Sequence, residues 1–253
     1  MADPARRLAC AALLLSPLVA RAALSDTIAR VKPSIVVVGT YMRSRAPAFM
    51  LRGTGFVVGN GTLVATNTHV ADTALDSQKL ETLAVLTLVD GQRQMREARI
   101  VASSPEHDLT LLQIEGPALP ALPLGDSSKV REGQSIAFIG FPIGSVLGFT
   151  PVTHRGIVSA ITPIAIPVDN MNRLNATNRS FLSRGSFPVF QLDATAYPGN
   201  SGSPVFDQDT GEVVGIINMV LVKAGKESGL SQPSGITYAI PVSHLAALMA
   251  APR

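Results

Sequence analysis

Ser201 lies in the segment Pro198-Gly199-Asn200-Ser201-Gly202, whose composition could make a serine hydroxyl reactive. A serine hydroxyl is a weak nucleophile unless a base removes its proton and N–H donors bind the oxyanion that forms. Gly199 can adopt a positive φ, which would turn its N–H toward the same point as the N–H of Ser201. The same five residues would also suit an ordinary turn between strands. This segment alone therefore predicts a nucleophile with only moderate specificity.

A base and a partner for that base occur earlier in the chain. His69 follows an apolar run of β type, and Asp108 directly precedes another such run. A lone histidine at a strand end is usually structural, and an isolated aspartate there usually caps a turn. The order histidine, aspartate, serine is nevertheless that of the chymotrypsin triad. The combination predicts acyl transfer in which Ser201 attacks, His69 takes its proton and Asp108 orients His69.

The remaining histidines are weaker candidates for the base. His107 is adjacent to Asp108 and is a rival to His69, but its place in the chain directs its side chain elsewhere. His154 and His244 have no comparable setting, and we expect both to lie at the surface.

The elements that must position these residues are short runs of β type bounded by Gly, Pro, Asn and Asp. Such runs fall into two groups of six, separated by the turn-rich segment Glu115–Arg131. This grouping predicts an all-β fold of two six-stranded antiparallel barrels, about 32–115 and 132–241. Pro241 should open a C-terminal helix over 242–250. The predicted strands are Ser34–Thr40, Gly55–Val58, Leu63–Asn67, Leu83–Val89, Glu97–Ala102, Leu109–Ile114, Ser135–Gly140, Thr150–Ile161, Phe187–Asp193, Ser203–Phe206, Glu212–Val222 and Gly235–Ile240.

Residues 1–22 have the features of a secretory signal peptide. A positive start at Arg6 and Arg7 is followed by an apolar stretch and then by Ala20-Arg21-Ala22, a small-x-small cleavage pattern. The apolar stretch is shorter than the ~20 residues of a membrane-spanning helix, which disfavours an anchor. A lipoprotein signal at Cys10 is disfavoured because Arg7 stands where an aliphatic residue is required. We therefore expect export to the periplasm or beyond, with no stable membrane insertion.

Composition then excludes several classes of partner. The chain has 21 basic and 18 acidic residues, and cleavage after Ala22 would remove three arginines and one aspartate, leaving 18 against 17. A net charge of +1 gives no basic surface for nucleic acid or anionic lipid. Cys10 is the single cysteine and would leave with the signal, so disulfides and thiol chemistry are not expected.

Several segments together resemble the HtrA (Deg) family of trypsin-like serine proteases, over nearly all of the mature chain. The histidine, aspartate and serine regions each match, as do segments between and within the predicted barrels. The matching segments are Gly53-Thr54-Gly55-Phe56-Val57-Val58, Thr66-Asn67-Thr68-His69-Val70, Asp108-Leu109-Thr110-Leu111-Leu112, Leu124-Gly125-Asp126-Ser127, Gly156-Ile157-Val158-Ser159, Asp193–Pro204 and Tyr238-Ala239-Ile240-Pro241.

The resemblance implies a chymotrypsin-like serine endopeptidase acting on exported, unfolded or misfolded proteins, without a metal or organic cofactor. It also implies a substrate pocket with Thr195 near the base and Asn218, Met219 and Val220 on the wall. With no acidic residue at the base, small aliphatic side chains would be preferred over Lys or Arg. An alternative is that these four residues face the core. HtrA relatives are often trimers, so a homo-oligomer is possible by resemblance.

This chain also departs from the family pattern. Ser203 stands where the family has a second glycine after the nucleophile, and Phe141 and Ile143 alter its Asn-Pro-Phe-Gly turn. The resemblance does not extend to the PDZ domains of many members. The irregular segment Thr162–Ser186 is interpreted as a mobile surface loop, with a role in substrate access or subunit contact as the alternative.

Other functions stay open at this point. A pseudoprotease or chaperone-like binder could keep the barrels without turnover, and an esterase could use the same triad. A third alternative is an exported all-β binding module in which Ser201 is merely a turn residue.

Overall fold

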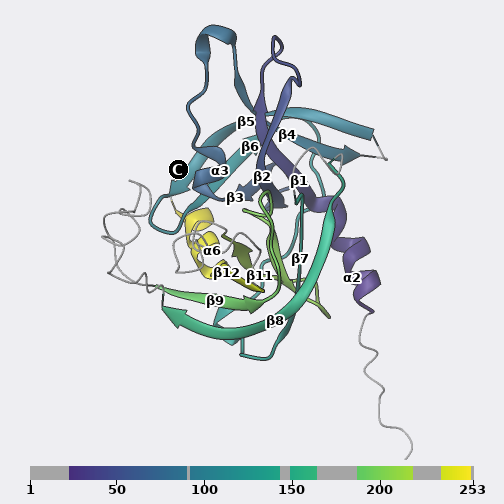
Figure 1. Ribbon diagram of the computed structural model, residues 1–253, viewed down its shortest axis with the longest axis vertical. Coiled ribbons are helices and arrows are strands. Elements are labelled where there is room, and N and C mark those ends of the chain that lie inside the picture. The colour runs from purple at the N-terminus through teal and green to yellow at the C-terminus, as the bar shows by residue number, and fades with distance from the viewer. Residues whose placement is uncertain (1–22, 90–91, 143–148, 164–186, 219–234, 252–253) are drawn as a thin grey trace, which may run out of the picture.

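The protein is described by a computed structural model over residues 23–89, 92–142, 149–163, 187–218 and 235–251. Within these residues the strands form two closed barrels, each of six strands paired antiparallel to their neighbours. The two barrels lie against each other, one above the other in Figure 1. The predicted all-β class with two six-stranded barrels is confirmed.

Barrel one contains the first six strands in the order β1-β2-β3-β6-β5-β4, and barrel two the last six in the order β10-β11-β12-β9-β8-β7. Their bounds are β1 (Ile35–Tyr41), β2 (Phe49–Val58), β3 (Leu63–Thr66), β4 (Thr82–Val89), β5 (Gln92–Ser104), β6 (Leu109–Ile114), β7 (Ser135–Gly140), β8 (Val152–Pro163), β9 (Pro188–Asp193), β10 (Pro204–Asp207), β11 (Val213–Ile217) and β12 (Ile236–Pro241). The helices are α2 (Leu24–Val31), α3 (Thr68–Ala71) and α6 (Val242–Ala250), with single 3-10 turns η1 (Lys32–Ser34), η2 (Ser77–Lys79) and η3 (Ser127–Lys129).

Two strands of barrel one are longer than their sequence patterns predict. β2 begins at Phe49, which pairs with Tyr41, and its first four residues are alternately half-buried and exposed. β5 begins at Gln92, opposite Val89, and most of its first half is exposed. The prediction missed the extension of β5 because its residues are mostly polar and exposed, and backbone pairing with β4 holds them. It missed the extension of β2 although Phe49 and Leu51 are apolar and pack against the core.

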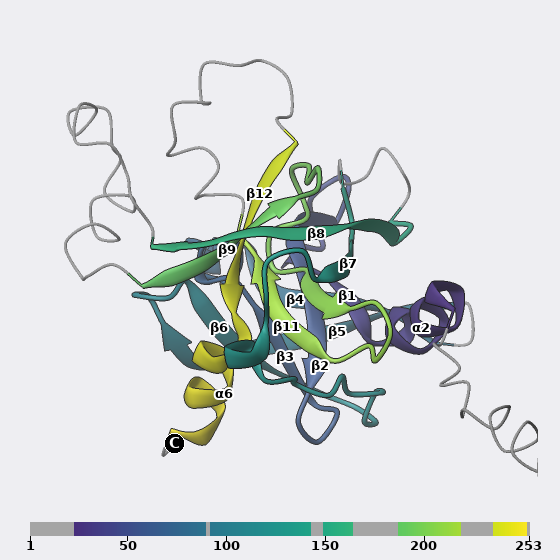
Figure 2. The same cartoon turned by 90° about the horizontal axis from the view of Figure 1, so that it is seen from below.

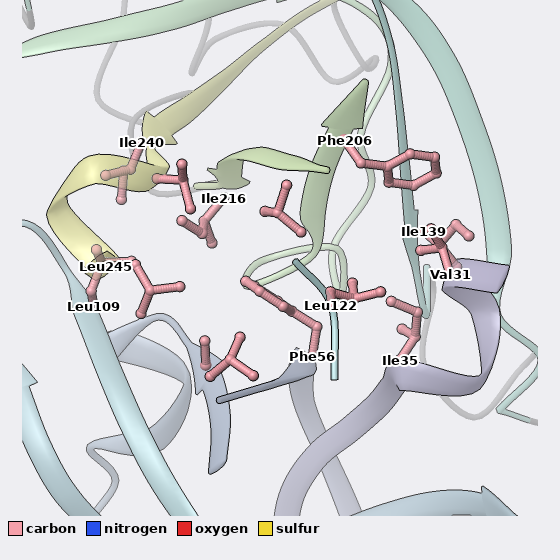
Figure 3. Close-up of a cluster of buried hydrophobic side chains, with 14 of the residues drawn as sticks. Val31, Ile35, Phe56, Leu109, Leu122, Ile139, Phe206, Ile216, Ile240 and Leu245 are labelled. Carbon is pink, nitrogen blue, oxygen red and sulfur yellow. The ribbon is translucent and has the colours of Figure 1, made fainter. Parts of the chain in front are cut away.

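The alternation of side chains along each strand divides most of the core into three large clusters, with Val189 buried apart from them. On β1, Val36 and Val38 point into barrel one, whereas Ile35 and Val37 join a cluster between the barrels. That second cluster draws on both barrels and on α6, as Figure 3 shows for Phe56, Phe206 and Leu245 among others. Since both faces of β1 are covered, the strand reads as a continuous apolar run. Apolar side chains of both barrels thus form one shared cluster where the barrels meet.

The flanking helices lie on opposite sides of the molecule (Figures 1 and 2). α2 packs on the turn between β10 and β11, where the Thr27 hydroxyl lies 3.5 Å from the carbonyl of Asp209. α6 follows β12 at Pro241 and buries Val242 and Leu245 in the cluster between the barrels. The predicted C-terminal helix is therefore present and contributes to the interface between the barrels.

Some predictions fall outside the described residues. The signal peptide predicted for residues 1–22, the residue Ile143 and positions 164–186 of the irregular segment are among them. Thr162 and Pro163, which we expected to begin that segment, instead continue β8. None of the helices within the described part of the chain is long and apolar enough to cross a membrane.

Candidate active site

The nucleophile segment forms a tight turn between β9 and β10. Gly199 and Gly202 adopt φ angles of 101° and 86°, a region that favours glycine. A Cβ on Gly202 would lie 2.1 Å from the carbonyl oxygen of Thr54, so the turn also needs glycine for its close approach to barrel one. Ser201 at its centre is 6% exposed. Local backbone chemistry thus places the serine at the boundary between the barrels.

Of the backbone N–H groups of residues 199–202, two donate within the protein and two have no acceptor among the described residues. Asn200 N–H donates to the carbonyl of Tyr197 at 2.9 Å, and Gly202 N–H donates to that of Ile217 at 3.0 Å. The N–H groups of Gly199 and Ser201 have no acceptor within the described ranges. These are the two donors that the sequence predicts for the oxyanion, and both are available to a ligand.

His69 is held by Asp108 through two contacts. The residue lies on α3, a single helical turn after β3, rather than at the strand end itself. Its backbone N–H donates to Asp108 Oδ1 at 2.9 Å, and its ring Nδ1 lies 2.5 Å from Asp108 Oδ2. Because a carboxylate only accepts, Nδ1 carries the hydrogen and Nε2 is left as the acceptor. That is the tautomer a general base requires.

Asp108 is itself fixed in an unusual backbone conformation. Its φ is 52°, in the left-handed region that aspartate tolerates better than most residues. Its carbonyl accepts from the backbone N–H of Thr68 at 3.1 Å and from the Asn67 side-chain amide at 3.0 Å. With 3% of its surface exposed, the aspartate offers its carboxylate to His69 from a rigid position.

Barrel two completes the shell around that carboxylate through Asn218. This residue follows β11, is fully buried, and donates from Nδ2 to Asp108 Oδ2 at 2.8 Å. The contact joins the two barrels at the candidate site. We had predicted Asn218 only for the pocket wall and missed this role. A buried asparagine at the end of an apolar strand must find a partner, which is the signal that could have shown it.

The turns that carry Ser201 and His69 lie close together, although no hydrogen bond joins the two side chains in the described structure. Thr54 N–H donates to the Ser201 carbonyl at 2.8 Å. A Cβ on Gly53 would lie 2.7 Å from Val70, next to His69, and 2.9 Å from the Ser201 carbonyl. Only a glycine lets the helix turn and the nucleophile turn approach so closely. Ser–His hydrogen bonds are often long without substrate and tighten when it binds.

The predicted substrate pocket is described only in part. Thr195 lies half-buried in the segment after β9, and Asn218 points its amide at Asp108. Met219 and Val220 lie outside the described residues. The pocket assignment of all four residues stays a prediction.

Ser203, where the chain departs from the family pattern, places an unpaired hydroxyl behind the nucleophile turn. Its Oγ is fully buried and has no hydrogen-bond partner among the residues that the structure describes, nor do the side-chain amide atoms of Asn200. A Cβ on Gly140 would lie 2.1 Å from Ser203 Oγ and 2.7 Å from Asn200 Oδ1, so the polar atoms gather around this glycine.

We therefore expect Ser203→Ala to stabilise the fold. A buried hydroxyl without a partner costs about 1–3 kcal/mol, and alanine removes it without changing the backbone. The free energy of unfolding, measured by urea denaturation, should rise by about 1–2 kcal/mol. A loss of stability in this variant would show that the hydroxyl has a partner, such as a buried water, that stabilises the turn.

Two of the histidines expected at the surface are partly buried. His154 stacks on Phe138 with ring centroids 4.7 Å apart, and burial lowers its pKa. His244 on α6 stacks on His107 of barrel one at 3.9 Å. Phe187 packs edge-on against both rings of that pair. The surface prediction was wrong for both residues, because neither the stacking of His154 on Phe138 nor that of His244 on His107 leaves a pattern in the local sequence.

The stacked pair predicts a loss of stability in acid. Burial, together with the neighbouring His107, lowers the pKa of His244 from 6.5 to about 4. Below pH 6.5 His244 is protonated in the unfolded chain but stays neutral in the folded chain. The free energy of unfolding therefore falls as the pH drops toward about 4. Glu106, beside His107, acts in the opposite sense on that histidine. Urea denaturation between neutral pH and about pH 4.5 should show a smaller loss for His244→Phe than for the wild type. Equal losses would contradict this origin.

The chain belongs to the family of trypsin-like peptidase domains, which its residues 53–216 match. This stretch contains His69, Asp108 and Ser201, so all three candidate residues lie inside the matched domain.

Individual relatives narrow the likeness to the HtrA/Deg group. A probable periplasmic serine endoprotease, DegP-like, of Marinomonas sp. (strain MWYL1) is 35% identical over 189 residues, which cover 75% of this chain and 33% of the relative. Its counterpart in Pseudomonas putida (strain GB-1) is 33% identical over 192 residues, 76% of this chain and 34% of that protein. The chain thus spans about a third of the length of the curated relatives it matches.

Solved structures agree with this likeness. The crystal structure of Deg5 aligns with a TM-score of 0.62 at 25% identity, over 88% of this chain and 90% of Deg5. The HtrA-type protease AlgW with a tripeptide aligns with a TM-score of 0.62 at 26% identity, over 90% of this chain and 62% of AlgW. The resemblance to HtrA/Deg proteases is confirmed.

Proposed function

We propose that the chain is a serine endopeptidase in which Ser201 is the nucleophile, His69 the general base and Asp108 the residue that orients it. The observation that carries the proposal is the two-point contact between His69 and Asp108, with Nδ1 2.5 Å from Oδ2 and the backbone N–H 2.9 Å from Oδ1. Membership of the trypsin-like peptidase family supports it.

In the proposed mechanism Ser201 Oγ attacks the scissile carbonyl carbon while His69 Nε2 accepts the hydroxyl proton. The N–H groups of Gly199 and Ser201 bind the oxyanion of the tetrahedral intermediate, and each donor contributes about 3–4 kcal/mol in comparable enzymes. His69 then protonates the leaving amine, and an acyl group remains on Ser201. Water activated by His69 hydrolyses this ester and restores the serine. The chemistry needs no metal or organic cofactor.

The proposed substrates are exported proteins in an unfolded or misfolded state. The relatives named above are described as periplasmic, which supports a periplasmic or secreted location, together with the signal peptide predicted for residues 1–22. Thr195, Asn218, Met219 and Val220 would form a pocket for small aliphatic side chains. A homo-oligomer, a trimer by resemblance, belongs to the same proposal.

Cleavage of a protein substrate tests this function. We expect the purified mature chain to degrade reduced, unfolded casein, with cuts mapped by mass spectrometry that follow small aliphatic residues. Hydrolysis of simple esters without cleavage of casein would favour an esterase instead. Binding of casein without any cleavage would favour a chaperone-like protein on the same fold.

A further inference from the structure

Thr54 of barrel one contacts the nucleophile turn of barrel two with two separate groups. It is a fully buried residue of β2. Its Oγ1 donates to the carbonyl of Gly199 at 2.7 Å, and its backbone N–H donates to the carbonyl of Ser201 at 2.8 Å. Neither contact is local, because Thr54 and Gly199 are 145 residues apart in sequence. One residue therefore fixes the turn at two points.

The two contacts bracket one of the oxyanion donors. The peptide that carries the Ser201 N–H lies between the carbonyl of Gly199 and the carbonyl of Ser201, which are the two groups that Thr54 holds. Gly199, with φ at 101°, has no side chain to restrict its backbone conformation. The hydrogen bond from Thr54 to the Gly199 carbonyl restricts this backbone, whose conformation sets the direction of the two N–H donors.

The hydroxyl of Thr54 is itself oriented. Oγ1 accepts the backbone N–H of Phe141 at 3.1 Å, which leaves the hydroxyl hydrogen for Gly199. The Thr54 carbonyl in turn accepts from the Thr66 hydroxyl at 2.7 Å. A β-branched side chain also has a restricted χ1, so the hydroxyl is held in place by packing as well. The support for the turn is thus rigid on the side of barrel one.

We propose that Thr54 is a positioning residue for the oxyanion hole. Its hydroxyl holds the Gly199 carbonyl so that the N–H groups of Gly199 and Ser201 point at the site where the tetrahedral oxyanion forms. This role rests on the proposed function. Loss of the Thr54 hydroxyl should therefore lower kcat and leave KM nearly unchanged, because the oxyanion forms in the transition state and is absent from the bound substrate.

The test compares Thr54→Val, which keeps the shape of the side chain and loses the hydroxyl, with Thr54→Ser, which keeps the hydroxyl. Steady-state cleavage of a peptide anilide should show kcat about 10–100-fold lower for valine, with KM within about twofold of the wild type, since loss of one donor costs about 10²–10³-fold. Serine should recover kcat to within about fivefold of the wild type.

A matched control separates positioning from stability. Thr87 is a buried threonine of β4 whose hydroxyl donates to the carbonyl of Gln94 in the neighbouring strand at 3.3 Å, and not to a residue of the nucleophile turn. Thr87→Val should lower the melting temperature about as much as Thr54→Val but leave kcat unchanged. Should valine not fit beside Gly140, Thr54→Ala removes the same hydroxyl.

Three outcomes would overturn the positioning role while the wild type stays active. These are an unchanged kcat in the valine and alanine variants, an equal loss in the serine variant, and an equal loss in Thr87→Val. A wild-type chain that neither cleaves peptides nor reacts with a fluorophosphonate would instead overturn the proposed function, and the positioning role with it.

Discussion

Replacing Ser201 by alanine is expected to lower kcat for peptide hydrolysis by about 10⁶-fold, because no other group can form the acyl intermediate. The size of the loss follows from the way the three residues act together. Once the nucleophile is absent, His69, which Asp108 orients, has no hydroxyl proton to accept. Only the amide donors and substrate binding remain, and in serine proteases these supply about 10³–10⁴-fold over the uncatalysed reaction.

The fold should tolerate this change. Ser201 carries no side-chain hydrogen bond among the described residues, and loss of its hydroxyl leaves the backbone contacts of the turn in place. Casein cleavage and circular dichroism should therefore show an inactive variant with native stability. Ser243→Ala provides the matched control, since Ser243 is an exposed residue of α6 and its replacement should leave cleavage unchanged. Substantial residual cleavage by Ser201→Ala would contradict the assignment.

The second large effect is expected at Asp108. Three N–H donors point at its carboxylate: the backbone and ring of His69 and the amide of Asn218. Asn at this position has one acceptor oxygen instead of two, so its own NH₂ must face at least one of these donors. The ring of His69 loses either its tautomer or its orientation. We expect Asp108→Asn to lower kcat by about 10⁴-fold at neutral pH.

Kinetics on a peptide anilide measure this loss, with Asp126→Asn as the control. Asp126 caps η3 through the N–H of Ser128, a role that asparagine can also fill, and it contacts neither His69 nor Ser201. The control should keep full kcat. If Asp108→Asn kept kcat within about tenfold of the wild type, Asp108 would not be the orienting residue, and His107 would have to be tested as the base.

Much of the fold could be predicted because its strands are short apolar runs between Gly, Pro, Asn and Asp. Strands such as β6, with both faces covered, are plain in the sequence. The polar first half of β5 could not be predicted in this way, since its neighbour across the sheet holds it. The start of β2 is apolar, but only alternate residues of it are half-buried, and its pairing with β1 sets where the strand begins. A single helical turn such as α3 has too few residues to produce a helical period.

In the candidate site, too, the residues in local sequence patterns could be predicted and the long-range contacts could not. Ser201, His69 and Asp108 were predicted because each stands in a recognisable local segment. The contacts of Asn218 with Asp108 and of Thr54 with Gly199 join residues more than one hundred positions apart, and neither leaves a local pattern. The left-handed conformation of Asp108 also escaped prediction, because it depends on the groups that hold its carbonyl.

The most direct test of the account is the site at which a fluorophosphonate reacts with the purified mature protein. Such a probe modifies a serine only where a base and an oxyanion hole activate it. Intact mass followed by peptide mapping should find one adduct per chain, on Ser201, and none on Ser201→Ala. Absence of an adduct from the folded wild type, or an adduct on another serine such as Ser203, would contradict the central claim.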